Sequence, residues 1–190
     1  LWIGLLYYFN FVQTEYFKES EASAKSDVVQ KLVPNALWYF RWAAAFTFLT
    51  GLYLLYWLSI TVNIGIVLGA LMGTLMAANV WFVIWPNQKK VIAGAPDAAD
   101  AGAKAGLASR TNTLFSLPML YLMVFSAHGG SLPMIAATDM TGLWVGIAII
   151  VLIEANALFG KMNPLITSVK AVIHSGLLLT LVFGILVHYL

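Results

Sequence analysis

Long apolar segments alternate with shorter polar segments along the whole chain. A helix needs about 20 mainly apolar residues to cross the hydrocarbon layer of a membrane, and six segments approach or exceed that length. The expected spans are residues 1–17, 35–59, 63–85, 113–127, 141–160 and 169–190. The pattern therefore predicts an all-α, polytopic integral membrane helix bundle with about six transmembrane helices, in a single domain over residues 1–190.

The third span ends in an aromatic segment that is typical of a membrane boundary. Trp81 and Trp85 are four residues apart, so they share a helix face, and indole rings favour the zone between hydrocarbon and headgroups. We expect Pro86 to end this helix. Lys89 and Lys90 follow directly, and lysine just outside a span marks the cytoplasmic side. This segment is therefore expected to lie at the cytoplasmic face.

The basic residues divide the connections into two groups. All ten lie at or beside the same three helix ends, whereas the connections at 59–63 and 127–142 have none. Because cytoplasmic loops carry an excess of lysine and arginine, we expect the connections at 18–34, 87–112 and 161–168 to be cytoplasmic. Both ends of the chain are then outside. The expected location is the bacterial inner (plasma) membrane, as a multi-pass protein.

Two local patterns predict how the spans connect and pack. Gly65, Gly69 and Gly73 are spaced by four residues, and such small residues let a neighbouring helix approach closely. The 94–112 segment is rich in alanine and glycine and predicts a loop with a weak surface helix. Pro118, inside the following span, predicts a kink.

Composition excludes several classes of protein. The chain is 61% hydrophobic and 9% charged, whereas about a quarter of the residues of a soluble domain are charged. The basic residues are scattered between apolar segments, so membrane lipid is the expected partner and nucleic acid is not. The absence of cysteine excludes disulfides, thiolate metal sites, iron–sulfur clusters and a covalently attached c-type haem. No metal centre is predicted.

Polar side chains gather at one depth, in the inner halves of the spans. They are Asn10, Gln13, Arg41, Asn79, Glu154, Asn156 and His174. Such groups are costly in hydrocarbon, so each needs a partner or a function. Glu154 lies about 9 Å inside its span, which predicts a partner among Arg41, Asn79 and His174, or else a protonated carboxyl group. These four are the candidate catalytic residues. Alternatively, Arg41 reaches the interface, and the asparagines only join neighbouring helices.

The three histidines raise the question of a haem b. A six-coordinate haem in a helix bundle needs two facing imidazoles at the same depth. His174 lies near the inner side, whereas His128 and His188 lie near the outer side. The candidate cofactor-binding residues are therefore His128 and His188. The alternative is that His128, which precedes two glycines, is solvated and that no cofactor is bound.

Three segments resemble the membrane domain of the bacterial membrane-bound urate oxidase (urate hydroxylase) family. They are residues 2–13 (WIGLLYYFNFVQ), 79–86 (NVWFVIWP) and 108–119 (ASRTNTLFSLPM). The resemblance implies a redox protein that oxidises urate or a related purine, or that transfers electrons. In that family a cytochrome c domain commonly follows the membrane domain, and this cysteine-free chain departs from that pattern. The resemblance therefore implies a separate cytochrome as electron acceptor, or loss of the oxidase role.

A rival hypothesis comes from another class of protein. The chain would be a non-catalytic accessory transmembrane subunit of a larger respiratory or photosynthetic complex, with other membrane subunits as partners and the polar side chains serving helix packing. A small-molecule transporter is a third hypothesis, which the lack of broken half-helices and of a convincing inverted repeat disfavours. A Soret band that shifts on reduction would favour the redox hypothesis over the accessory one.

Overall fold

The computed structural model describes residues 1–57, 63–128 and 140–189, and the elements in these ranges are helices. They are α1 (Trp2–Tyr7), the π-helical η1 (Tyr8–Gln13), α2 (Thr14–Glu19), α3 (Ala22–Lys31), α4 (Val33–Trp57), α5 (Ile64–Ala78), the π-helical η3 (Asn79–Ile84), α6 (Trp85–Ile92), α7 (Ala98–His128), α8 (Thr141–Phe159) and α9 (Val169–Tyr189). This confirms the predicted all-α bundle.

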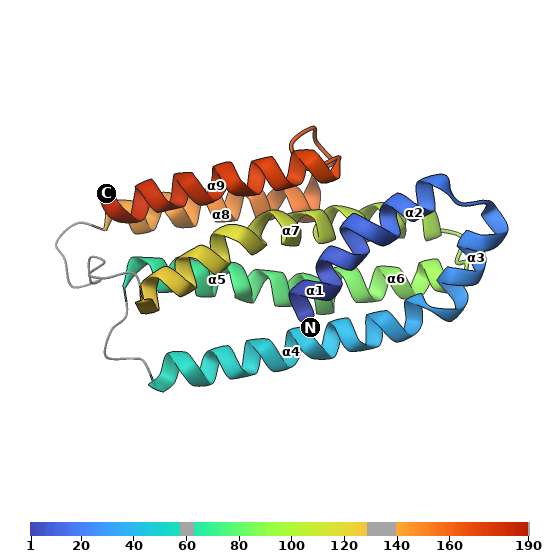
Figure 1. The fold of residues 1–190 in the computed structure, drawn as a ribbon, viewed down its shortest axis with the longest axis horizontal. Helices are drawn as coiled ribbons and strands as arrows, with labels where there is room; N and C mark the ends of the chain where they lie inside the picture. Colours follow the sequence, from blue (N-terminus) through green and yellow to red (C-terminus); the bar gives the residue numbers. More distant parts are fainter. Residues whose placement is uncertain (58–62, 129–139, 190) are drawn as a thin grey trace.

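The long helices lie side by side along one axis (Figure 1). Elements α1, η1 and α2 form one continuous helix, and α5, η3 and α6 form another. The turns from α2 to α3, α6 to α7 and α8 to α9 lie at one end of the bundle, whereas α4 ends and α5 begins at the other. The three basic connections therefore share one end, as the charge pattern predicted.

Within the described residues, three helical segments are long and apolar enough to cross a membrane, by length and composition. They are Ile64–Ile92, Thr141–Phe159 and Val169–Tyr189. On α4, apolar side chains such as Phe46 and Tyr53 also face outwards. Both features are typical of a membrane protein. The count of six spans stays a prediction.

Two expectations about helix ends are wrong. The third span does not end at Pro86, because its helix continues to Ile92. The π-helical segment η3 ends at Ile84, two residues before the proline, which thus lies in the first turn of α6, where its ring and its missing N–H are tolerated. The 94–112 segment is not a loop either, since α7 begins at Ala98 and is 31 residues long. Alanine favours a helix, and its small side chain lets α7 pack closely on α6, where Gly102 faces Val91.

Helix α7 is the centre of the bundle and packs against α1, η1, η3, α5, α6, α8 and α9. The predicted glycine stripe faces it. A Cβ on Gly69 or Gly73 of α5 would meet the side chain of Met123 on α7. Helix α9 also packs closely on α7 through glycines, because Gly176 and Gly184 face side chains of α7. The prediction that the α5 glycines face a neighbouring helix is confirmed for Gly69 and Gly73.

The predicted orientation can be tested by cysteine labelling, because the natural chain has no cysteine. Single cysteines at Ser26 in α3 and Ala99 in α7, both exposed, should react with an impermeant maleimide only after the cells are permeabilised. A cysteine at Ser131, which lies outside the described residues, should react in intact cells. Labelling of Ala99→Cys but not Ser131→Cys in intact cells would show that the orientation is opposite to the predicted one.

Candidate functional site

A network of buried amide and carboxylate groups joins three helices at the centre of the bundle. Asn79, the first residue of η3, donates from Nδ2 to Asn112 Oδ1 of α7 at 3.0 Å and to Glu154 Oε2 of α8 at 3.1 Å. Asn112 donates in turn to the Met76 carbonyl at 2.9 Å. The three side chains are at most 7% exposed. We call Asn79, Asn112 and Glu154 the amide–carboxylate network.

A second set of polar contacts joins α7 to the first helix. Asn10 of η1 donates to Ser109 Oγ at 2.8 Å and to the Leu6 carbonyl at 2.9 Å. One turn earlier, the Tyr7 hydroxyl lies 2.8 Å from Ser116 Oγ. Because Ser116 donates its proton to the Thr113 carbonyl, Tyr7 is the donor to Ser116.

Both π-helical segments hold a buried asparagine that bonds α7. Asn10 lies within η1, and Asn79 begins η3. A π-turn is wider than an α-turn and changes which way the following side chains face, and it is common at functional sites. Residues 2–13, 79–86 and 108–119 supply both asparagines and their partners Ser109 and Asn112. The segments that carry the family resemblance therefore meet on α7.

The structure brings together two of the four predicted catalytic residues. Glu154 and Asn79 are bonded, as the depth of Glu154 predicted. Arg41 instead stacks its guanidinium 3.8 Å from the centre of the Trp85 ring. His174 is exposed on α9, and its Nδ1 lies 2.7 Å from the Lys170 carbonyl. Within the described residues neither Arg41 nor His174 forms an ion pair with Glu154.

The two histidines proposed for haem lie at the opposite end of the bundle. His128 is the last residue of α7 and His188 is near the end of α9, and both are exposed. The His188 ring packs against Phe125 at 4.9 Å between centroids. His128 lines an open groove on α7 that does not include His188. The described residues do not form an enclosed slot between two imidazoles, so haem b stays a prediction and no step below depends on it.

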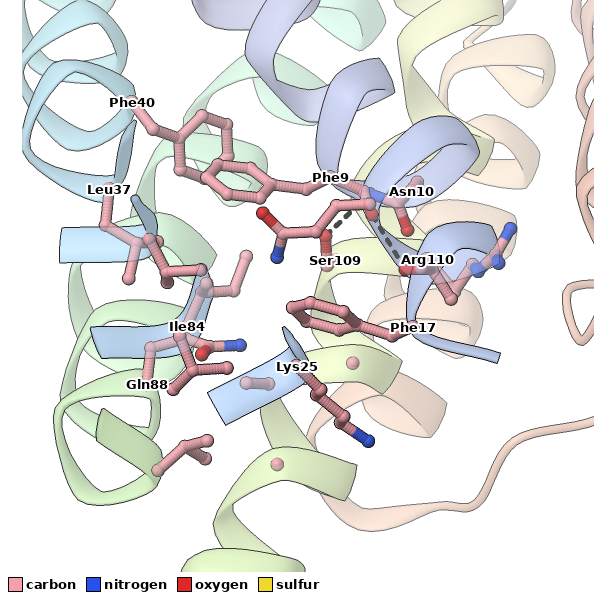
Figure 2. Close-up of a pocket in the computed structure, with 18 of the residues that line it drawn as sticks. Phe9, Asn10, Phe17, Lys25, Leu37, Phe40, Ile84, Gln88, Ser109 and Arg110 are labelled. Carbon is pink, nitrogen blue, oxygen red and sulfur yellow. Dashed lines mark hydrogen bonds between the residues drawn. The ribbon is translucent and has the colours of Figure 1, made fainter. Parts of the chain in front are cut away.

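A cavity of about 410 Å³ opens between the first helix, α3, α4, α6 and α7, near the end that holds the basic connections. Figure 2 shows Phe9, Leu37, Phe40 and Ile84 as its apolar wall. The rings of Phe9 and Phe40 meet edge to face at 5.4 Å. The cavity can therefore hold a flat apolar surface against an aromatic wall.

The rest of the lining combines polar and basic side chains with apolar ones. The polar and basic residues are Asn10, Gln13, Thr14, Lys18, Lys25, Gln88, Ser109, Arg110 and Thr167. Figure 2 shows Gln88 and Lys25 at the edge of the space, and Arg110 beside Asn10 with its guanidinium turned away from Phe9. No aspartate or glutamate lines the cavity among the described residues. The lining is therefore suited to a ligand with an apolar face and with polar or negatively charged groups on its edge.

Two lining residues have polar atoms without a partner. Gln13 Oε1 is buried and accepts no hydrogen bond, and Arg110 Nη1 is buried and donates none. Arg110 is only 4% exposed. A buried polar atom without a partner costs free energy, so Gln13 Oε1 is a place where a ligand would gain a bond that the protein itself does not make. The Arg110 guanidinium, which is turned away from Phe9, is not assigned to the ligand.

Sequence reasoning missed Asn112, Ser109 and Arg110, because the 94–112 segment was expected to be a loop. A signal was present, since residues 108–119 belong to the resemblance and place five polar side chains in a row, from Ser109 to Thr113. On a helix these five side chains point in all directions. The four from Arg110 to Thr113 are buried, which is possible only if the helix is surrounded, as α7 is.

Fold and site together define a helical membrane protein with a buried polar network beside a cavity in one half of the bundle. The family model described as urate oxidase N-terminal matches residues 63–186, well over half of the chain. The chain therefore belongs to the urate oxidase N-terminal family, and the resemblance is confirmed. The matched region includes Asn79, Asn112 and Glu154. No curated protein and no solved structure shows a significant match.

Proposed function

We propose that this chain is the membrane domain of an oxidoreductase that binds urate or a related purine anion in the cavity beside Phe9. The observation that carries the proposal is the lining itself: aromatic on one side, amide and basic on the other, and free of carboxylates among the described residues. The proposed location is the bacterial inner membrane, with the cavity towards the cytoplasm.

The lining residues have distinct proposed roles. The Phe9 and Phe40 rings cover the flat face of the purine. The amides of Gln13 and Gln88 supply donors and acceptors for the alternating N–H and C=O groups on its edge. Lys25, exposed at the edge of the space, raises the local concentration of an anionic substrate, whereas Lys18 is paired with Glu15.

The oxidation also needs routes for protons and electrons. Hydroxylation of the ring with an oxygen from water releases both. Ser109 lines the cavity and lies three residues, about 4.5 Å of helix rise, before Asn112 on α7. Asn112 is linked through Asn79 to Glu154, so the Glu154 carboxylate is the proposed group for proton exchange. We propose that the electrons pass to a separate acceptor, a cytochrome.

Gln13→Leu is the test of the cavity. Leucine removes a buried oxygen that has no partner in the protein, so thermal stability should be unchanged or slightly raised. The Kd for urate should rise about tenfold or more, because a hydrogen bond at a buried site contributes about 1–2 kcal/mol. Isothermal titration of the protein in detergent measures the Kd.

Gln30→Leu is the matched control, because Gln30 lies outside the cavity and donates to the Ile92 carbonyl at 2.9 Å. It should lower stability slightly and leave the Kd for urate unchanged. Absence of urate binding by the natural protein would contradict the proposal and favour the accessory-subunit hypothesis. Equal Kd values for Gln13→Leu and the natural protein would place the site elsewhere.

A further inference from the structure

A basic and aromatic surface lies where α4 meets the η3–α6 helix. It consists of Arg41 and Trp42 on α4 with Trp81, Trp85 and Lys89, and we call it the Arg41 seam. The last three residues are spaced by four and share one face of their helix. Trp81 Nε1 donates to the Arg41 carbonyl at 3.1 Å, and its ring meets that of Trp42 edge to face at 5.4 Å. These contacts between the two helices therefore hold the side chains of the seam in a defined arrangement.

Two cations share the ring of Trp85. The Arg41 guanidinium carbon lies 3.8 Å from its centroid, and Lys89 Nζ lies 5.1 Å from it. Arg41 Nε is buried and has no hydrogen-bond partner. Within the described part of the chain, no acceptor and no carboxylate meets the rest of the guanidinium. The stacking orients the guanidinium but leaves its donors free.

Among the described residues, three other cations at the same end of the bundle are paired. Lys90 bonds Asp97 at 2.6 Å, Lys18 bonds Glu15 at 2.7 Å, and Lys31 pairs with Asp27. The bond from Lys90 holds the pKa of Asp97 below its usual value. Lys89, beside Lys90 in the sequence, has no such carboxylate among the described residues. The Arg41 seam is therefore a local excess of positive charge.

The position of the seam indicates where its counter-ion comes from. Indole rings mark the zone between hydrocarbon and headgroups, and Trp81 and Trp85 place Arg41 at that level. An arginine near hydrocarbon is costly unless it meets an anion. The groups that surround a membrane protein at this depth are lipid phosphates. Exposed apolar side chains continue from the seam along α4 and η3, and they include Phe46, Leu49 and Phe82.

We propose that the Arg41 seam binds the headgroup of an anionic phospholipid of the inner leaflet. The guanidinium donates two N–H bonds to phosphate oxygens, which its planar fork matches, and Lys89 supplies a second positive charge. The acyl chains lie along the apolar side chains of α4. A phosphatidylcholine headgroup carries its own cation, which Arg41 and Lys89 would repel, so the seam selects a lipid without one, such as phosphatidylglycerol. This site is independent of urate binding.

The test compares lipids added to the delipidated protein in detergent. Phosphatidylglycerol should raise the Tm, because a ligand that binds only the folded state stabilises it. Phosphatidylcholine at the same concentration should raise it much less. Native mass spectrometry should show retained phosphatidylglycerol. Arg41→Gln should weaken its binding about tenfold or more, and Arg41→Lys should restore only part of the affinity, because lysine keeps the charge but not the fork.

Lys104→Gln is the control for charge alone, since Lys104 is exposed at the same end of the bundle and lies outside the seam. It should leave phosphatidylglycerol binding unchanged. Where Arg41→Gln does not yield folded protein, Lys89→Gln tests the same site from an exposed side chain. Equal effects of the two lipids, or equal losses in the Lys104 and seam variants, would overturn the proposal. An equal Tm rise with inorganic phosphate would assign the seam to free anions instead.

Discussion

Replacing Gly69 by leucine is expected to destabilise the protein by forcing α5 away from α7. A Cβ at this position would lie 3.1 Å from Met123 Cγ and 3.4 Å from Leu122 Cβ, and leucine adds three further carbons beyond it. The central helix α7 is surrounded on its other sides, so α5 would have to move away from it. Overpacking of this kind costs about 1–3 kcal/mol, which thermal unfolding in detergent, followed by circular dichroism, would detect.

Gly51→Leu is the matched control for this prediction. Gly51 is also helical, but a Cβ there would meet nothing within 4 Å. Because leucine has the higher helix propensity, by up to about 1 kcal/mol, this change should leave the Tm unchanged or raise it. Equal destabilisation by the two substitutions would mean that the α5 glycines are not packed against α7.

Much of the fold could be predicted from local patterns. The limits of α4, α8 and α9 differ by about two residues or fewer from the apolar segments that predicted them. The glycine stripe of α5 faces a helix, as its spacing indicated. These features depend only on the apolar content and spacing of neighbouring residues, which a sequence displays directly.

Other features could not be predicted because they depend on distant residues. The first half of α7 has a weak pattern of its own, and it is buried only because α6 and the first helix cover it. The helix continues through Pro86, which lies in the first turn of α6. Because the predicted span began only at residue 113, Ser109 and Asn112 could not be identified as the partners of Asn10 and Asn79.

The depth of Glu154 in its span predicted a set of possible partners but could not identify the one that it bonds. Counting residues from the end of its span placed Glu154 level with Arg41, Asn79 and His174, and one of these is its partner. The choice among them depends on how each helix is rotated about its own axis. That rotation puts Asn79 in the centre, turns Arg41 towards Trp85 and leaves His174 exposed.

The carboxylate of Glu154 is expected to be needed for turnover but not for folding. A glutamine side chain at this position would have the same shape as the glutamate, and its Oε1 can accept the bond from Asn79. The free energy of unfolding of Glu154→Gln should therefore lie within about 1 kcal/mol of that of the natural protein. It cannot exchange a proton, so urate oxidation should fall by about 100-fold or more. Steady-state kinetics with an added electron acceptor measure the loss.

Two further variants separate proton exchange from packing. Glu154→Asp keeps a carboxylate on a shorter side chain, so it should restore part of the turnover that glutamine loses. Asn112→Leu leaves Asn79 with one acceptor fewer and should cost about 1–2 kcal/mol of stability. Its rate should fall less than that of Glu154→Gln, because the carboxylate remains.

The comparison decides between the two roles of the amide–carboxylate network. If Glu154 only joins α8 to η3, glutamine replaces it fully, and the rate and its pH profile stay as in the natural protein. That outcome would reject proton exchange at Glu154. It would leave the proposed urate site intact, because Gln13→Leu tests that site through the Kd alone. If Glu154 exchanges protons, both variants should bind urate normally. Glu154→Gln should then lose turnover, and Glu154→Asp should regain part of it.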